Sequence, residues 1–138
     1  MEFNTPLRYP GGKGKLTEFL KYVINENDLL GCDYAEPYAG GAGIAVSLLL
    51  HGYAQCIHLN DLNLSVFSFW HSVVHCPDEL CQLIRDTPVT MDEWYRQKAI
   101  QANQADCSPL ELGFSTFFLN RTNRSGIIWG GVIGGKKQ

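Results

Sequence analysis

A glycine-rich turn near the start of the chain has residue types that suit a nucleotide-like ligand. It reads Tyr38-Ala-Gly-Gly-Ala-Gly and places Gly40, Gly41 and Gly43 before an apolar run. In open α/β sheets, ligands bind beyond the carboxyl ends of the strands, where glycine admits close approach and a helix offers N–H groups. Asp61 follows the next strand-like segment, at the spacing of a carboxylate that accepts hydrogen bonds from ribose hydroxyls. The pattern predicts an adenosine-containing ligand.

Two residues beside this turn bear on the kind of ligand. A dinucleotide motif read from Gly41 and Gly43 needs a third small residue, and Val46 stands there. Glu36, at the end of the first predicted strand, would repel a pyrophosphate but suits the cationic amino acid part of S-adenosylmethionine. The sequence thus favours a methyl donor and disfavours a nicotinamide dehydrogenase. The alternative, that the glycines form only a tight turn, stays open.

The elements that must position these residues follow from the hydrophobic periodicity. A basic Pro/Gly-rich loop over residues 7–15 precedes a helix, and a strand at 34–37, a helix at 44–51 and a strand at 55–60 follow. This order is the first half of a doubly wound parallel sheet. Further helices are predicted over residues 62–86 with a break near Pro77, over 91–104 and over 109–119.

Composition bounds the class of protein. The 138 residues are 45% hydrophobic and 12% aromatic, which is enough for one globular core. We expect a cytoplasmic protein without a membrane span, because neither a long apolar run nor a signal sequence occurs. The five cysteines lack a CxxC pair, so we expect reduced thiols and no metal. His71 and His75 are interpreted as one helix face rather than as metal ligands.

Charge is distributed unevenly along the chain. The net charge is −3, but Glu111 is the last acidic residue. Two basic groups lie toward the two ends of the sequence: Arg8, Lys13 and Lys15, and Arg121, Arg124, Lys136 and Lys137. They would form one phosphate-facing surface if the fold brought them together.

Four motifs together carry a resemblance to a known family. Glu36-Pro-Tyr-Ala-Gly-Gly-Ala-Gly looks like the acid-Pro-aromatic-x-Gly-x-Gly cofactor motif of the DNA adenine methylase (Dam-like) family. Arg8-Tyr-Pro-Gly-Gly-Lys, Leu59-Asn-Asp-Leu-Asn and Phe118-Leu-Asn-Arg-Thr-Asn-Arg-Ser-Gly resemble three further family segments, in the family's order. The chain therefore resembles the N-terminal part of a DNA adenine-N6 methyltransferase. One departure is Arg8-Tyr-Pro, where some relatives have Lys-Trp-Ala.

The resemblance implies a partial Rossmann-like methyltransferase fold that binds S-adenosylmethionine and double-stranded DNA. It assigns residues 1–75 to the cofactor-binding half and residues 76–138 to a helical segment with the start of a DNA-recognition hairpin. Tyr9 would cover the donor with its ring, and Lys13 would lie near the methyl group and the target base. The implied pocket residues are Tyr9, Gly11, Gly12, Lys13, Glu36, Pro37, Tyr38, Gly40, Gly41, Gly43 and Asp61.

The C-terminal segment predicts a β-hairpin. Residues 127–133 read Ile-Ile-Trp-Gly-Gly-Val-Ile, with Gly130-Gly131 between two apolar runs as in a two-residue turn. By resemblance, Asn120, Arg121 and Arg124 position DNA and Trp129 wedges or stacks. The alternative is that the hairpin packs as a core strand. The DNA recognition sequence is not predicted.

No catalytic residue is assigned. In the family an Asp-Pro-Pro-Tyr motif orients the flipped adenine, and this tetrapeptide does not occur in the 138 residues. We therefore expect an incomplete and inactive fragment, with the missing C-terminal part of the enzyme as a candidate partner. The alternative is a non-catalytic module that binds DNA or a protein partner.

Overall fold

The computed structural model describes residues 5–136, which form two compact units. The strand unit holds residues 5–6 and Gly11–Asp61, and the helical unit holds Leu7–Pro10 and residues 62–136. The sequence divides the chain by function after residue 75, and that division stays a prediction. Among the described helices, none is long and apolar enough to cross a membrane.

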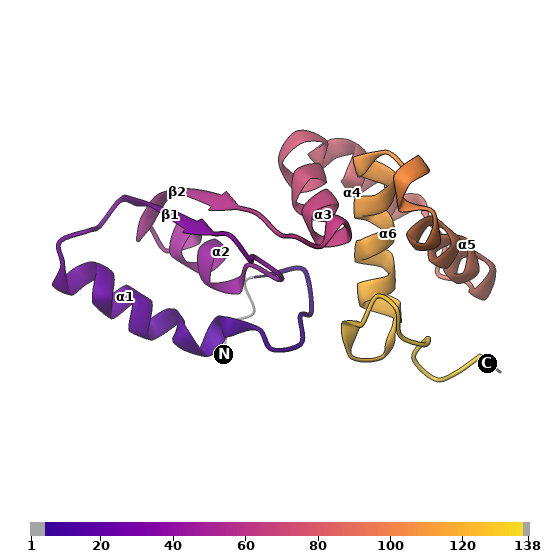
Figure 1. Ribbon diagram of the computed structural model, residues 1–138, viewed down its shortest axis with the longest axis horizontal. Coiled ribbons are helices and arrows are strands. Elements are labelled where there is room, and N and C mark those ends of the chain that lie inside the picture. Colours follow the sequence, from indigo (N-terminus) through magenta and orange to yellow (C-terminus); the bar gives the residue numbers. More distant parts are fainter. Residues whose placement is uncertain (1–4, 137–138) are drawn as a thin grey trace. The chain divides into compact units, whose positions relative to one another are not determined.

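The strand unit is a short parallel β-α-β arrangement preceded by a helix (Figure 1). A 3-10 turn η1 (Lys13–Leu16) leads into α1 (Thr17–Glu26) and β1 (Cys32–Glu36), and α2 (Gly43–Leu50) connects β1 to β2 (Ala54–Leu59). The strands pair in parallel, as the predicted strand, turn, helix and strand order requires.

The core of the strand unit lies between the two helices and one face of the strands. Ile24 of α1, Ile44 and Leu48 of α2 and Ala54 of β2 are buried together. Tyr34 and other partly buried side chains pack against them. Because successive side chains of a strand point to opposite faces, this core uses one face of the pair and leaves the other exposed.

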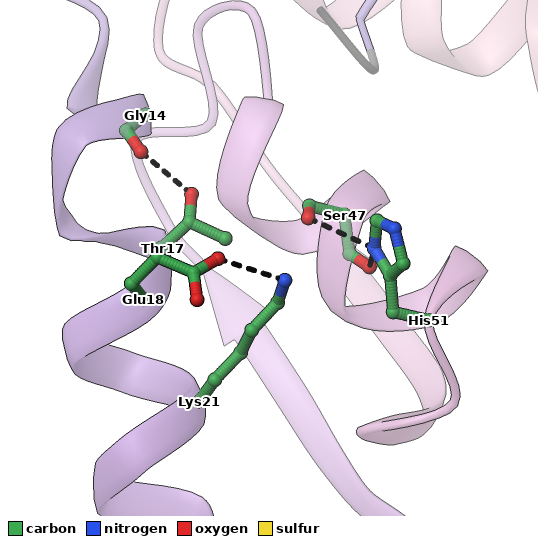
Figure 2. A network of polar contacts seen from close by, with 6 residues as sticks. All are labelled: Gly14, Thr17, Glu18, Lys21, Ser47 and His51. Carbon is green, nitrogen blue, oxygen red and sulfur yellow. Dashed lines mark hydrogen bonds and ion pairs between the residues drawn. The ribbon is translucent and has the colours of Figure 1, made fainter. Parts of the chain in front are cut away.

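Polar contacts on the helices of this unit are local (Figure 2). The Thr17 hydroxyl donates to the Gly14 carbonyl at 2.7 Å, and Lys21 pairs with Glu18 at 2.9 Å, three residues away. Glu18 is exposed, and a helical pair of this spacing contributes only a few tenths of a kcal/mol, about 0.2–0.5. Apolar burial therefore holds the strand unit together.

The helical unit consists of four helices and two 3-10 turns within the described residues. They are α3 (Leu64–His75), α4 (Pro77–Asp86), α5 (Met91–Ala102), η2 (Gln104–Asp106), α6 (Pro109–Thr122) and η3 (Arg124–Gly126). Helices α3 and α6 lie side by side (Figure 1). Gly113 allows this approach, since an added Cβ there would lie 2.6 Å from the Ser68 carbonyl oxygen.

Capping residues explain where these helices begin. The Asn63 side chain accepts from the Ser65 N–H at the start of α3, and Pro77 occupies the first turn of α4. Ser108 and Glu111 form a capping box at the start of α6. The predicted break at Pro77 is confirmed, because proline is compatible with a first helical turn but not with a helix interior.

The predicted hairpin is wrong. Between Arg124 and Lys136 no strand forms, and one isolated antiparallel bridge joins Asn123 to Val132. Gly130 and Gly131 do not make a two-residue turn, since the bridged residues are joined by η3 and by a turn in which the Gly130 N–H donates to the Ile127 carbonyl at 2.9 Å. The physical reason is that side chains bind the carbonyls of residues 127, 128 and 130, which strand pairing would otherwise use.

Candidate functional site

The glycine turn lies at the carboxyl ends of β1 and β2. Gly40 and Ala42 adopt the left-handed conformation, with φ of +52° and +50°, and Ala42 precedes the first residue of α2. The Ala39 N–H donates to the Asn60 carbonyl at 2.9 Å, which attaches the turn to the end of β2. The turn backbone is therefore held where a helix begins, the position that favours bound anions and polar ligands.

Asp61 contacts this turn directly. Its Oδ2 accepts from the Gly40 N–H at 2.8 Å. The structure thus brings together the glycine turn and the acid that the sequence assigned to a ribose. A carboxylate has about four acceptor sites on its two oxygens, so the bond to Gly40 is compatible with ribose hydroxyls as further donors.

Glu36 ends β1 with a buried carboxylate, only 4% exposed. Its Oε1 accepts from the Tyr34 hydroxyl at 3.2 Å, whereas its Oε2 has no hydrogen-bond partner among the described residues. Burial raises the pKa of the Glu36 carboxyl above its usual value, an effect opposed by the Lys13 charge, by the Tyr34 hydroxyl and by the nearby Ala45 backbone N–H, which does not reach hydrogen-bond geometry with Oε2. Burial, and secondarily the Glu36 charge, raises the pKa of Tyr34 to about 12. A buried carboxylate oxygen without a donor is costly unless a ligand supplies one.

Lys13 joins the N-terminal glycine loop to the turn after β1. Its Nζ donates to the Tyr38 carbonyl at 3.0 Å, and its charge acts on Glu36. The Tyr38 ring is 72% exposed, and Pro37, Gly11 and Gly12 are exposed as well. The structure therefore brings Lys13 to the turn after β1, where Gly40 and Asp61 also meet. Contact of Gly11 and Gly12 with a cofactor stays a prediction.

Tyr9 belongs to the other unit. The segment Leu7–Pro10 packs with the helical unit, and the Tyr9 side chain is 44% exposed. A cofactor contact through Tyr9 stays a prediction.

The basic loop, residues 124–131, replaces the predicted hairpin. It is closed by a hydrogen bond from the Arg124 N–H to the Gly131 carbonyl at 2.9 Å. Ser125 and Gly126 adopt positive φ of +57° and +71°, which turns the chain sharply after α6. Trp129 is 59% exposed on this loop.

Three side chains that are not among the predicted site residues hold the basic loop, Asn123 and Lys98 directly and Trp94 through Asn123. Asn123 is fully buried, and its Nδ2 donates to the Ile127 and Ile128 carbonyls at 2.9 Å each. Its Oδ1 accepts from Trp94 Nε1 at 2.6 Å. Lys98 Nζ lies 3.3 Å from the Ile128 carbonyl oxygen.

The same lysine also contacts aromatic rings. Lys98 Nζ donates to the Gly130 carbonyl at 3.3 Å and lies 5.3 Å from the centre of the Trp129 ring. Burial, with the Lys136 charge as a smaller cause, lowers the pKa of Lys98. Trp94 and Lys98 occupy neighbouring turns of α5, four residues apart, but nothing in the local sequence indicates that this helix face meets a loop some 30 residues later.

With this geometry established, comparison with known proteins identifies the family. The model of the D12 class N6 adenine-specific DNA methyltransferase family matches residues 9–128. The chain belongs to this family. A search of curated proteins found no match to the chain. The matched range includes the glycine turn, Asp61 and much of the basic loop, and the family's reaction is methylation of adenine in DNA. The predicted membership in a DNA adenine methyltransferase family is confirmed.

Asn120, predicted as a DNA contact in this methyltransferase, is buried instead. It is 3% exposed, and its Nδ2 donates to the carbonyls of Arg8 at 2.6 Å and Gly126 at 2.9 Å. Its Oδ1 accepts from the Arg8 N–H at 2.8 Å. The side chain thus attaches residue 8 to the start of the basic loop, and its polar atoms face the protein.

The basic residues of the methyltransferase sequence are divided between the two units. Arg8 lies in the helical unit with Arg121 and Arg124, which are exposed, whereas Lys13 and Lys15 lie in the strand unit. Lys136 Nζ lies over the rings of Trp94 and Tyr95, and Lys137 is outside the described residues.

Proposed function

We propose that this methyltransferase chain binds S-adenosylmethionine through the strand unit and double-stranded DNA through the basic loop. The observation that carries the first part is the buried Glu36 carboxylate with one oxygen lacking a donor, beside the glycine turn and Asp61. The proposal goes beyond family membership, because it assigns the cofactor to residues of this chain.

The donor set suits S-adenosylmethionine. The ammonium group of its amino acid part is a charged donor for Glu36 Oε2, and its ribose hydroxyls are donors for Asp61. We propose the turn backbone at Gly40, Gly41 and Gly43 as the wall against which the adenosyl part lies. By the family resemblance, Lys13 lies near the methyl group and the target base. The bound donor supplies a methyl group on a sulfonium.

The second part of the proposal concerns DNA. Arg121 and Arg124 are exposed at the end of α6 and the start of the loop, where they can contact phosphates. We propose that Trp129 stacks on or wedges between bases, because its ring is exposed while Lys98 and Asn123 bind the carbonyls around it. A ring presented on an ordered loop loses less conformational entropy on binding.

We further propose that the chain alone binds its ligands without transferring the methyl group. The Asp-Pro-Pro-Tyr motif that orients adenine in this family does not occur in the 138 residues, so we assign no catalytic residue. The second candidate, a non-catalytic module that binds DNA or a protein partner, predicts no binding of S-adenosylmethionine.

Calorimetric titration with S-adenosylmethionine tests the cofactor site. Glu36→Gln keeps the size of the side chain and removes its charge, so we expect Kd to rise about tenfold or more, as for a lost hydrogen bond to a charged group. Glu26→Gln changes an exposed glutamate at the end of α1 and should leave Kd unchanged. No binding by the unaltered chain, or equal affinities for the two variants, would contradict the proposal.

Fluorescence anisotropy with a labelled duplex tests the loop. Arg124→Gln should weaken binding and reduce the salt dependence of log Kd by about one unit of slope, which corresponds to one lost phosphate contact. Arg85→Gln removes an exposed arginine of α4 as the matched control. Equal slopes for the two variants would argue against the loop as the DNA contact.

The calorimetric titration separates the two candidate functions, and a transfer assay tests the proposed inactivity of the chain alone. With labelled donor and an adenine-containing duplex, binding of both ligands without labelled DNA supports the proposed function of the chain alone. Labelled DNA would show that these residues suffice for catalysis and would overturn the assignment of inactivity.

A further inference from the structure

The exposed face of the strand pair carries three side chains with different ligand chemistry. Asp33 lies on β1, and Cys56 and His58 lie on β2. Their candidate ligand atoms all lie within 4.8 Å of one another, and His58 Nε2 is 3.2 Å from Asp33 Oδ2. None of the three belongs to the proposed cofactor pocket.

Parallel pairing explains why these residues meet. Asp33 is opposite Cys56 in the register, and the small Ala35 is opposite His58. Cys56 and His58 are two residues apart on one strand, so their side chains point to the same face. That face is opposite to the one that packs on α2, where Tyr34 and Ile57 join the core. The backbone of two paired strands thus brings the ligand atoms together without a flexible loop.

We propose that Asp33, Cys56 and His58 bind a divalent transition-metal ion of the zinc type. A thiolate, an imidazole and a carboxylate are ligands that Zn²⁺ takes together in proteins, whereas Mg²⁺ and Ca²⁺ bind oxygen ligands. Three protein ligands leave a fourth tetrahedral position for water or an added group. The thiol proton is released to solvent when the metal–sulfur bond forms.

Such an ion would join the two strands of the sheet. An isolated pair of strands is marginally stable, and here the pair is covered on one face. A metal bound by both strands stabilises the folded state in proportion to the logarithm of its concentration over Kd. The expectation of no metal rested on sequence spacing, which does not show that residues more than 20 positions apart lie on adjacent strands.

The histidine pair of α3 is the competing location. The rings of His71 and His75 have centroids 4.4 Å apart. They supply two nitrogen ligands and no thiolate, so a metal bound there gives no sulfur charge-transfer absorption. This spectroscopic difference separates the two locations.

Titration of the whole chain with Co²⁺, followed by near-ultraviolet absorption, tests the site. We expect one equivalent to produce a thiolate-to-cobalt charge-transfer band, and Zn²⁺ to remove the band by displacement. Cys56→Ser should abolish the band, and Asp33→Asn or His58→Asn should raise Kd at least about tenfold, since loss of even an indirect ligand contact costs this much. A non-chelating reductant keeps the thiols reduced.

Matched controls use residues of the same types elsewhere. Cys81→Ser removes another exposed cysteine, on α4, and His75→Asn removes the competing pair; both should leave band and stoichiometry unchanged. Zn²⁺ should also raise the melting temperature of the unaltered chain but not that of Cys56→Ser. A band that persists in Cys56→Ser, or the absence of any band, overturns the proposal. These readouts need neither S-adenosylmethionine nor DNA, so they are independent of the proposed function.

Discussion

The two units differ in whether their buried polar side chains find hydrogen-bond partners beside the basic loop and beside the glycine turn. In the helical unit, the buried side-chain amides of Asn123 and Asn120 donate hydrogen bonds to backbone carbonyls of the basic loop and of residue 8. In the strand unit, the buried Glu36 carboxylate leaves one oxygen without a partner beside the glycine turn. The buried amides of the helical unit thus fix a loop, whereas the unpartnered acceptor of Glu36 is the group on which the proposed cofactor site depends.

The units differ in where the buried polar atoms without partners lie, and not in whether such atoms occur. Two buried atoms of the helical unit, His71 Nδ1 and Gln97 Oε1, also lack partners among the described residues. Around the basic loop, however, Asn123 bonds at both ends of its amide. The buried amides beside the basic loop are thus satisfied within the protein, whereas one carboxylate oxygen beside the glycine turn is not.

Removal of the Asn123 side chain should have the largest effect on stability. Asn123→Ala leaves Trp94 Nε1 and the carbonyls of Ile127 and Ile128 without their buried partner, so we expect a loss of about 3 kcal/mol in the free energy of unfolding. Urea unfolding followed by circular dichroism measures it. Asn103→Ala removes one exposed bond and should cost less than about 0.5 kcal/mol. Equal losses would show that the buried amide of Asn123 does not stabilise the helical unit more than an exposed one does.

A methyl group added between α3 and α6 by Gly113→Ala should cause the next largest loss of stability. Gly113→Ala places a Cβ 2.6 Å from both Ser68 O and Ser72 Oγ, so we expect a loss of about 2 kcal/mol despite the better helix propensity of alanine. Gly131→Ala is the matched control, because nothing lies within 4 Å of its Cβ position. Thermal melts compare the two variants. A stable Gly113→Ala protein would mean that α3 and α6 separate easily, contrary to the close approach of Gly113 to Ser68.

The smallest expected change in the free energy of unfolding is that of Glu36→Gln, and it depends on pH. Because the folded pKa of Glu36 lies above the unfolded value of about 4.5, its contribution to stability is fully present below that pH and is lost as pH rises through the folded pKa. Glu36→Gln should remove this decline and unfold at slightly higher urea near neutral pH, by less than about 1 kcal/mol.

Unfolding midpoints measured from about pH 4 to about pH 8 test this prediction, with Glu26→Gln as the control that retains the decline. An unaltered decline in Glu36→Gln would show that another group causes it. Saturating S-adenosylmethionine sharpens the comparison, since an ammonium paired with Glu36 favours the ionised carboxylate, lowers the folded pKa and should reduce the loss of stability with rising pH.

Most secondary structure could be predicted because its signals are local. The strand near residues 34–37 is Cys32–Glu36, and the strand at 55–60 is Ala54–Leu59. The break at Pro77 and the start of α6 at Pro109 follow from capping chemistry within a few residues. The hairpin failed because its glycine pair is equally compatible with a loop, and Asn123 and Lys98 from outside the segment bind its carbonyls.

The candidate site likewise has features that the sequence could predict and features that it could not. The meeting of the glycine turn with Asp61 could be expected, because consecutive parallel strands end at the same edge of a sheet. The burial of Asn120 and the role of Lys98 could not, because they depend on how α5 and α6 pack against the loop.

By itself, the sequence determined the order of elements, the glycine turn and the family, since these are written in neighbouring residues and their periods. Tertiary structure decided that Asp33 meets His58, that Asn123 meets Trp94, and that one oxygen of Glu36 is buried without a partner. Such meetings depend on strand register and helix packing, which the whole chain sets through its core and which no local spacing specifies.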